Sequence, residues 1–187
     1  KTTWLVARIT DELIGRYKPK TCPPDFAVIA VDGSHIDVDR HSVARCCLIN
    51  IGSVVLRYGQ KPDATLRSLP TLYASEQDLT IIDPLGSGAQ PLERELLGIK
   101  RAVAECQALA ELCENLPHNL PALALLDGSL IMWGLAGQAY PDYVKKELLE
   151  NGFLQALNRI KEISQRNKVA LASYISFPRS TEVVNTL

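Results

Sequence analysis

The sequence is short of the features that mark several large classes of protein. Its 20 basic and 21 acidic residues nearly cancel, which disfavours a protein that coats DNA or lies on an anionic membrane. Arg45 and Asp127 interrupt its two most apolar stretches, so neither reaches the ~20 residues that cross a bilayer. No Gly-x-x-x-x-Gly-Lys motif occurs, which argues against ATP hydrolysis at a P-loop.

Zinc ribbons and redox motifs also lose support. The five cysteines are odd in number, and none forms a C-x-x-C pair. We therefore expect reduced, mostly buried thiols in a cytoplasmic protein. Residues 1–16 are amphipathic and carry acids, unlike a secretion leader.

The chain is long enough and apolar enough for one folded core, with 187 residues of which 47% are hydrophobic. Periodicity predicts a helix at 3–17, and a proline-rich linker follows at 18–25. Residues 1–25 are therefore interpreted as an N-terminal helix and linker, and 26–187 as the core. Since a last helical pattern begins near Ser180 and the sequence soon ends, we expect a further C-terminal part.

Apolar runs and helical periods predict the elements of the core. The expected elements are strands at 26–31, 122–127 and 169–176, one bent hairpin at 41–58, a long ordered loop at 59–90, and helices at 91–115, 142–167 and from 180. Antiparallel opening strands, followed by strands that alternate with helices, predict a mixed α/β sheet. This order is that of the ribonuclease H-like fold.

Two segments repeat one pattern, an apolar strand followed by Asp-Gly-Ser, at Asp32 and at Asp127. Either motif alone is an ordinary turn that ends a strand. If both strands are central and parallel, however, both aspartates reach the same edge of the sheet, where ligands bind. Two carboxylates held close together need a proton or a cation between them, and oxygen ligands suit Mg²⁺ or Mn²⁺.

The helix predicted at 91–115 offers a third acid. Glu95 and Glu105 fall within its apolar face, where an unpaired charge is costly. At ~1.5 Å per residue, Glu105 lies about 15 Å before the helix end, near the level of Asp127, whereas Glu95 overshoots and is kept in reserve. The alternative for Glu105 is a salt bridge to Arg101, one turn earlier.

Asp32, Glu105 and Asp127 are therefore predicted to be catalytic residues that bind two divalent ions. One ion would generate a hydroxide nucleophile, and the other would stabilise the leaving oxygen of a phosphodiester. Asp37 and His35 are further candidates, although a solvated strand edge for Asp37 and a simple turn for His35 are the favoured interpretations.

The pattern Ala30-Val-Asp32-Gly-Ser, Arg101-x-x-x-Glu105 and Leu125-Leu-Asp127-Gly-Ser-Leu resembles the NurA nuclease family over about residues 26–180. The resemblance implies a ribonuclease H-like nuclease that uses Mn²⁺ or Mg²⁺. It further implies 5′ to 3′ exonuclease and single-strand endonuclease activity on DNA. The implied partners are a HerA-like hexameric translocase in double-strand break repair and a second copy of the chain.

Several polar residues near these motifs are expected to bind the DNA substrate. The resemblance places a polar strand end near the site at 173–180, although a capped helix start would explain its arginine equally well. The predicted substrate-binding residues are Ser34, Arg101, Ser129, Tyr174 and Arg179.

Two other functions remain open on the sequence. Phosphotransferases of the sugar-kinase or actin class also place an Asp-Gly-Ser or Asp-Gly-Thr turn after a first strand, but their second phosphate loop is not evident here. A non-catalytic scaffold of the same fold would bind a translocase or itself. ATP binding distinguishes the phosphotransferase from the nuclease.

Overall fold

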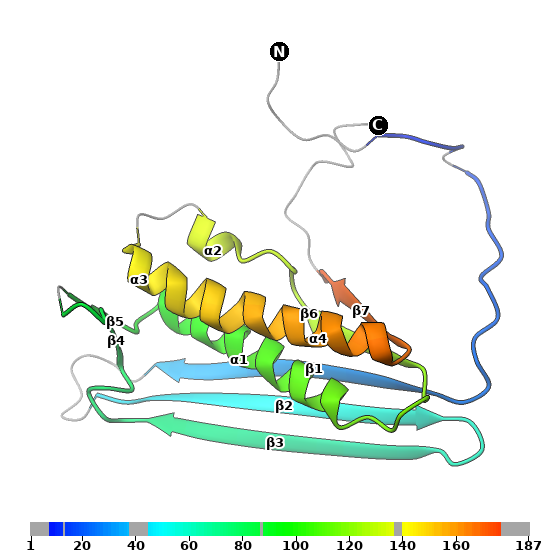
Figure 1. Ribbon diagram of the computed structural model, residues 1–187, viewed down its shortest axis with the longest axis horizontal. Helices are drawn as coiled ribbons and strands as arrows, with labels where there is room; N and C mark the ends of the chain where they lie inside the picture. Colours follow the sequence, from blue (N-terminus) through cyan, green and yellow to red (C-terminus); the bar gives the residue numbers. More distant parts are fainter. Residues whose placement is uncertain (1–7, 13, 38–44, 87, 137–139, 177–187) are drawn as a thin grey trace.

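The computed structural model describes residues 8–12, 14–37, 45–86, 88–136 and 140–176, and shows a sheet with helices on one face (Figure 1). The strands are β1 (Phe26–Asp37), β2 (Cys47–Tyr58), β3 (Asp63–Tyr73), β4 (Thr80–Ile82), β5 (Ala89–Pro91), β6 (Ala122–Asp127) and β7 (Val169–Tyr174). The helices are α1 (Glu95–Glu114), α2 (Trp133–Ala136), α3 (Asp142–Lys145), the π-helix η1 (Lys146–Leu154) and α4 (Gln155–Arg166). None of these helices is long and apolar enough to cross a membrane.

The main sheet has five strands in the order β3-β2-β1-β6-β7. β1 pairs antiparallel with β2, and β2 with β3, whereas β1, β6 and β7 run parallel to one another. Along the chain, α1 precedes β6, and α2, α3, η1 and α4 lie between β6 and β7. This topology confirms the ribonuclease H-like fold.

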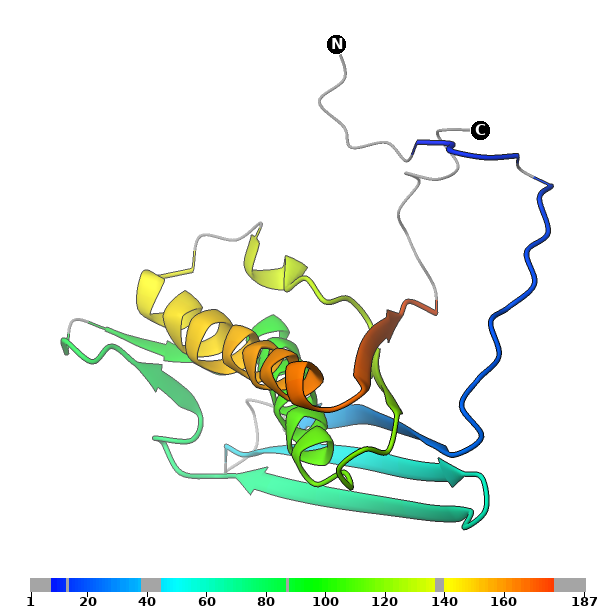
Figure 2. The same ribbon diagram turned by 45° about the vertical axis from the view of Figure 1, so that its right-hand side comes forward.

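The core lies between the sheet and the helices, and strand alternation decides which residues enter it. Ala27, Ile29 and Val31 of β1 are buried, as are Ala124 and Leu126 of β6. They pack in one cluster with the apolar face of α1 and with residues of η1 and α4. Both views show α1 and α4 lying together over this face of the sheet (Figures 1 and 2).

The opposite face of the sheet carries the alternate residues and is not covered by any helix of the described chain (Figure 2). Val28, Ala30 and Val54 on this face are half-buried, and Leu66 of the edge strand β3 is 74% exposed. One face of the sheet therefore supports the core, and the other is open.

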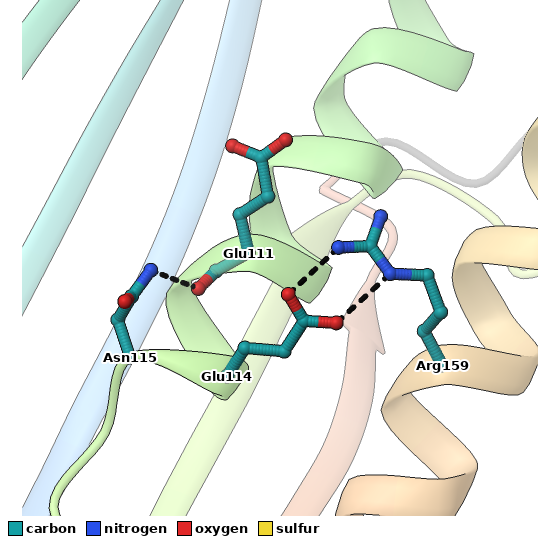
Figure 3. Close-up of polar contacts among 4 residues, drawn as sticks. All are labelled: Glu111, Glu114, Asn115 and Arg159. Atoms are coloured by element: carbon teal, nitrogen blue, oxygen red, sulfur yellow. Dashed lines mark hydrogen bonds and ion pairs between the residues drawn. The ribbon is translucent and has the colours of Figure 1, made fainter.

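An ion pair joins the C-terminal end of α1 to α4 (Figure 3). The Arg159 guanidinium donates to both carboxylate oxygens of Glu114, at 2.9 and 2.8 Å. Beside it, the Asn115 side-chain amide donates to the carbonyl of Glu111 at 2.8 Å and so closes the helix end. Because both charged side chains are more than one-third exposed, the pair contributes at most about 1 kcal/mol and mainly fixes geometry.

Several expected elements differ from the structure. Residues 8–12 and 14–25 form no helix, so the helix predicted at 3–17 is wrong over its described part. Ile14 is 88% exposed and this segment runs clear of the sheet, so a short amphipathic helix has no surface to bury its apolar face (Figure 1).

The hairpin predicted at 41–58 is also wrong over its described residues, because 47–58 form one strand that pairs with both neighbours. The predicted loop at 59–90 contains β3, which begins after a tight turn at Gly59 with φ of 119°. Asp32-Gly33-Ser34 is not a turn, since β1 continues through it, paired with Gly52, Ile51 and Asn50 of β2. Pairing along the whole of β2 overrides the local preference of Asp-Gly-Ser for a turn.

The helix predicted at 142–167 is present, but its middle is π-helical. Gly152, the predicted weak point, lies in this segment and is buried against α1. A Cβ atom there would lie 2.7 Å from Cγ1 of Val103. The glycine therefore sets how closely η1 approaches α1.

All five cysteines are free thiols, and burial accounts for the raised pKa values of two of them. Cys47, Cys106 and Cys113 are buried, Cys46 is partly buried and Cys22 is exposed. Desolvation raises the pKa of Cys106 to about 12 and that of Cys113 to about 11, so both remain protonated thiols in the core.

Two glycine substitutions test the close packing of α1 against η1. We expect Gly152→Ala to lower the free energy of unfolding by about 1–3 kcal/mol, because the new methyl group collides with Val103. Gly98→Ala is the matched control, since its Cβ would meet nothing closer than 3.9 Å, and we expect a gain of about 0.5–1 kcal/mol in helix stability. Urea denaturation measures both, and equal effects would contradict the packing argument.

Candidate functional site

Asp32 and Asp127 lie side by side on the open face of the sheet. Val31 pairs with Leu126, so the two aspartates follow paired positions on adjacent parallel strands. At this point β6 ends, whereas β1 continues with β2 as its partner. Both aspartates are exposed and line a shallow cavity of about 530 Å³.

Glu105 approaches the same place from the helix side. It lies on α1 and is only 6% exposed. Its carboxyl group rests against the backbone of Gly33, where an added Cβ atom would lie 2.5 Å from Glu105 Oε1. Only glycine at this position lets the glutamate come so close to β1, directly beside Asp32.

The environment of Glu105 links it electrostatically to both aspartates. Burial raises its pKa to about 7, and the negative charges of Asp32 and Asp127 act in the same direction. The positive charge of Arg101 and a backbone hydrogen bond from Gly33 oppose the rise. The structure thus places the three predicted acids near enough to interact electrostatically, with Asp32 and Asp127 on the open face and Glu105 on the helix-covered face.

Arg101 lies one helical turn before Glu105. Its Nη1 donates to the carbonyl of Gly33 at 2.5 Å and is 3.2 Å from Glu105 Oε1. The salt bridge considered from the sequence is therefore present, together with the proximity to the aspartates. The guanidinium binds two protein oxygens, and its role in substrate binding stays a prediction.

The donor atoms fit a divalent cation in kind and charge. Glu105 Oε1 is buried and makes no hydrogen bond to any described residue, although it faces Arg101. The described residues do not, however, contain a preassembled group of three or more His, Cys, Asp or Glu ligands. A shared ion would require the exposed aspartates to turn toward Glu105.

The other predicted site residues are distributed around this centre. Tyr174 pairs in register with Asp127 on β7, is 67% exposed and lines the same cavity. Ser34 is exposed on β1, and the hydroxyl oxygen of Ser129 accepts the backbone N–H of Ile131 at 3.0 Å. Arg179 lies outside the described residues.

The reserve residues lie toward the N-terminal half of α1. Glu95 is exposed at the helix start, ten residues or about 15 Å before Glu105. Asp37 accepts the backbone N–H of Arg94 at 3.4 Å, and the ring of His35 lies near Gly98. The structure does not bring Glu95 beside Gly33, where Glu105 lies.

Two residues of the site were not recognised from the sequence. Arg67 borders the cavity beside the aspartates from the edge strand β3, in the segment predicted as a loop, although its register with Ser53 puts it on the helix-covered side of the sheet. Gly33 was noted only as part of a turn motif. A glycine between an acid and a serine within an otherwise apolar strand was the available signal.

Comparison with protein families places the chain in a family. The model of the NurA domain matches residues 26–187. The chain belongs to the NurA family. NurA is a nuclease family, and membership supports nuclease activity as the class of function. None of the curated proteins compared with the sequence matches it.

Solved structures similar to this NurA chain include a viral protease–reverse transcriptase and two ribonucleases H. A native prototype foamy virus protease–reverse transcriptase has a TM-score of 0.43 and 13% identity, with 90% of this chain and 20% of that chain covered. LC9-RNase H1 has a TM-score of 0.36 and 10% identity, covering 89% and 71%. The solution structure of the foamy virus RNase H domain has a TM-score of 0.35 and 12% identity, covering 88% and 87%.

The NurA chain spans only about a fifth of the first of these proteins. At such low similarity the comparisons carry no functional argument, and the fold assignment depends on the strand order and directions described above.

The raised pKa of Glu105 predicts a pH-dependent stability of the metal-free protein. The folded-state pKa, about 7, exceeds the ordinary value of 4.5, so the folded state holds the proton more tightly. The resulting stabilisation is complete below about pH 4.5 and is lost as the pH rises through 7. In EDTA, we expect the free energy of unfolding to fall by about 2 kcal/mol between pH 5 and pH 8 from this group.

Glu105→Gln should remove this dependence, because the amide does not ionise. Urea denaturation at both pH values measures it. Glu111→Gln, an exposed position on the same helix, is the control and should retain the wild-type pH dependence. If Glu105→Gln loses as much stability as the wild type between pH 5 and pH 8, the assignment of the pH dependence to Glu105 is contradicted.

Proposed function

We propose that the chain is a divalent-metal-dependent deoxyribonuclease that hydrolyses phosphodiesters. The observation that carries this proposal is the placement of one buried carboxyl, Glu105, against β1 beside two exposed ones, Asp32 and Asp127. Three neighbouring acids suit a site that binds cations and, through them, a polyanion. Membership of the NurA family supports the same conclusion.

The residues that would hold Mn²⁺ or Mg²⁺ are Asp32, Glu105 and Asp127, because these hard ions prefer carboxylate oxygens. When bound as a pair, such ions supply a hydroxide nucleophile and stabilise the leaving oxygen. Glu105 contributes a fixed ligand, since its burial and the contact with Gly33 leave it little freedom. Asp32 and Asp127 are exposed and contribute ligands on the substrate side.

The cavity beside the aspartates provides surfaces for orienting a DNA strand. Tyr174 and Ser176 line this cavity and supply a ring and a hydroxyl for a DNA strand. Half-buried apolar residues, such as Ala30 and Leu125, also line this cavity. These groups recognise the backbone and the faces of bases, so we expect little sequence preference.

The wider proposal follows the family. It includes 5′ to 3′ exonuclease and single-strand endonuclease modes, processing of DNA ends in double-strand break repair, a HerA-like translocase as partner, a homodimer and a cytoplasmic location. The five free cysteines are compatible with a reducing compartment.

Cleavage of end-labelled DNA tests the proposal. We expect the full chain to cleave in Mn²⁺ and not in EDTA, and Asp127→Asn or Asp32→Asn to lower the rate at least about 100-fold, because each removes a metal ligand at almost constant volume. Asp63→Asn, an exposed acid at the start of β3, should keep the wild-type rate. Circular dichroism confirms that each variant is folded.

Equal cleavage by all four proteins, or cleavage that persists in EDTA, would refute the assignment. A calorimetric titration with ATP addresses the phosphotransferase alternative. Saturable ATP binding that depends on Asp32 would favour that alternative over the nuclease.

A further inference from the structure

We propose that Arg101 is a positioning residue that acts as an internal counter-cation: it holds Glu105 in the metal-free site and competes with a divalent ion for Glu105 Oε1. This inference rests on the proposed metal site. It assigns Arg101 a role different from the substrate binding predicted for it from the sequence.

The geometry shows one nitrogen bridging two elements. Arg101 Nη1 contacts the Gly33 carbonyl on β1 at 2.5 Å and Glu105 Oε1 on α1 at 3.2 Å. The arginine stem also lies close to the strand, because a Cβ atom on Gly33 would be 3.0 Å from Arg101 Cγ. The guanidinium therefore links the Glu105 carboxylate to the Gly33 backbone against which that carboxylate packs.

The contact between Arg101 and Glu105 is largely shielded from water. The side chains of Arg101 and Glu105 are 31% and 7% exposed, so water screens the pair only partly. Arg101 Nε and Glu105 Oε1 are both buried and have no hydrogen-bond partner among the described residues. Glu105 Oε1 thus faces the Arg101 charge without a well-formed hydrogen bond, which leaves the atom available to a stronger cation.

Arg101 competes with a metal ion because both carry positive charge. A metal ion bound at Glu105 Oε1 meets the guanidinium at the same oxygen, and two positive charges about 4 Å apart repel each other. In a partly exposed site, this repulsion corresponds to a change in metal affinity on the order of tenfold. The arginine stabilises the site when it is empty and weakens it toward metal.

Manganese binding to the full chain tests this role. We expect Arg101→Gln to bind Mn²⁺ about tenfold more tightly than the wild type in a calorimetric titration at pH 8. Arg101→Lys keeps the charge and should remain near the wild-type affinity. Lys100→Gln is the matched control, because its ammonium lies on another side of α1, over the ring of Tyr73 at 4.2 Å, and its affinity should not change.

A second measurement follows the wild type and uses a variant only to assign the signal. In ¹⁵N spectra of the wild type, the Nε–H of Arg101, assigned by its loss in Arg101→Lys, should exchange slowly with solvent without metal. It should shift and exchange faster as Mg²⁺ is added, because the guanidinium then leaves Glu105.

The outcomes separate this inference from the proposed function. If the wild type and its Asp127→Asn variant bind Mn²⁺ equally or not at all, the metal site itself is refuted, and the role of Arg101 with it. If Mn²⁺ binding depends on Asp127 but Arg101→Gln binds no more tightly, or the Nε–H signal ignores Mg²⁺, only the role of Arg101 is overturned. An equal gain in Lys100→Gln would also overturn it, because net charge would explain the effect.

Discussion

The site depends on one close approach, that of the Glu105 carboxyl group to the backbone of β1 at Gly33. A buried carboxylate is costly unless a positive charge or a hydrogen bond compensates it. Arg101 and the Gly33 backbone supply this compensation in part. The long helix α1 makes the approach possible, because its packing on the sheet sets the height at which Glu105 meets the strand.

The two faces of the sheet have different roles. The helix-covered face supplies the core and carries the fixed acid, whereas the open face presents Asp32 and Asp127 together with the cavity. Strand alternation places Asp32 and Gly33 on opposite faces, so β1 contributes residues to both faces of the sheet. The end of the pairing between β1 and β6 is where the two sides meet.

Much of this arrangement could be predicted from local patterns. Apolar runs located the strands that carry Asp32 and Asp127, and helical periodicity with the rise per residue selected Glu105 over Glu95. The catalytic role of these acids stays a prediction. Long-range pairing was harder to foresee: β3 has no clear period, and its membership of the sheet, with Arg67, depends on β2 rather than on its own residues.

Two wrong predictions have a common cause. Residues 3–17 have an amphipathic pattern but no surface to pack on in the described part, and Asp32-Gly33-Ser34 has turn chemistry but a paired neighbour strand. In both cases the tertiary context outweighed the local preference. Propensity alone could not reveal which segments find partners.

The contact at Gly33 has a consequence for recognising active relatives. It joins a side chain to the main chain, so its loss leaves every acidic residue of the motif in place. A homologous sequence with all three acids and a bulkier residue at position 33 would therefore keep the acids and lose the contact that holds Glu105 against β1. Surveys that sort active from degenerate members by counting acids need to inspect this neighbouring position as well.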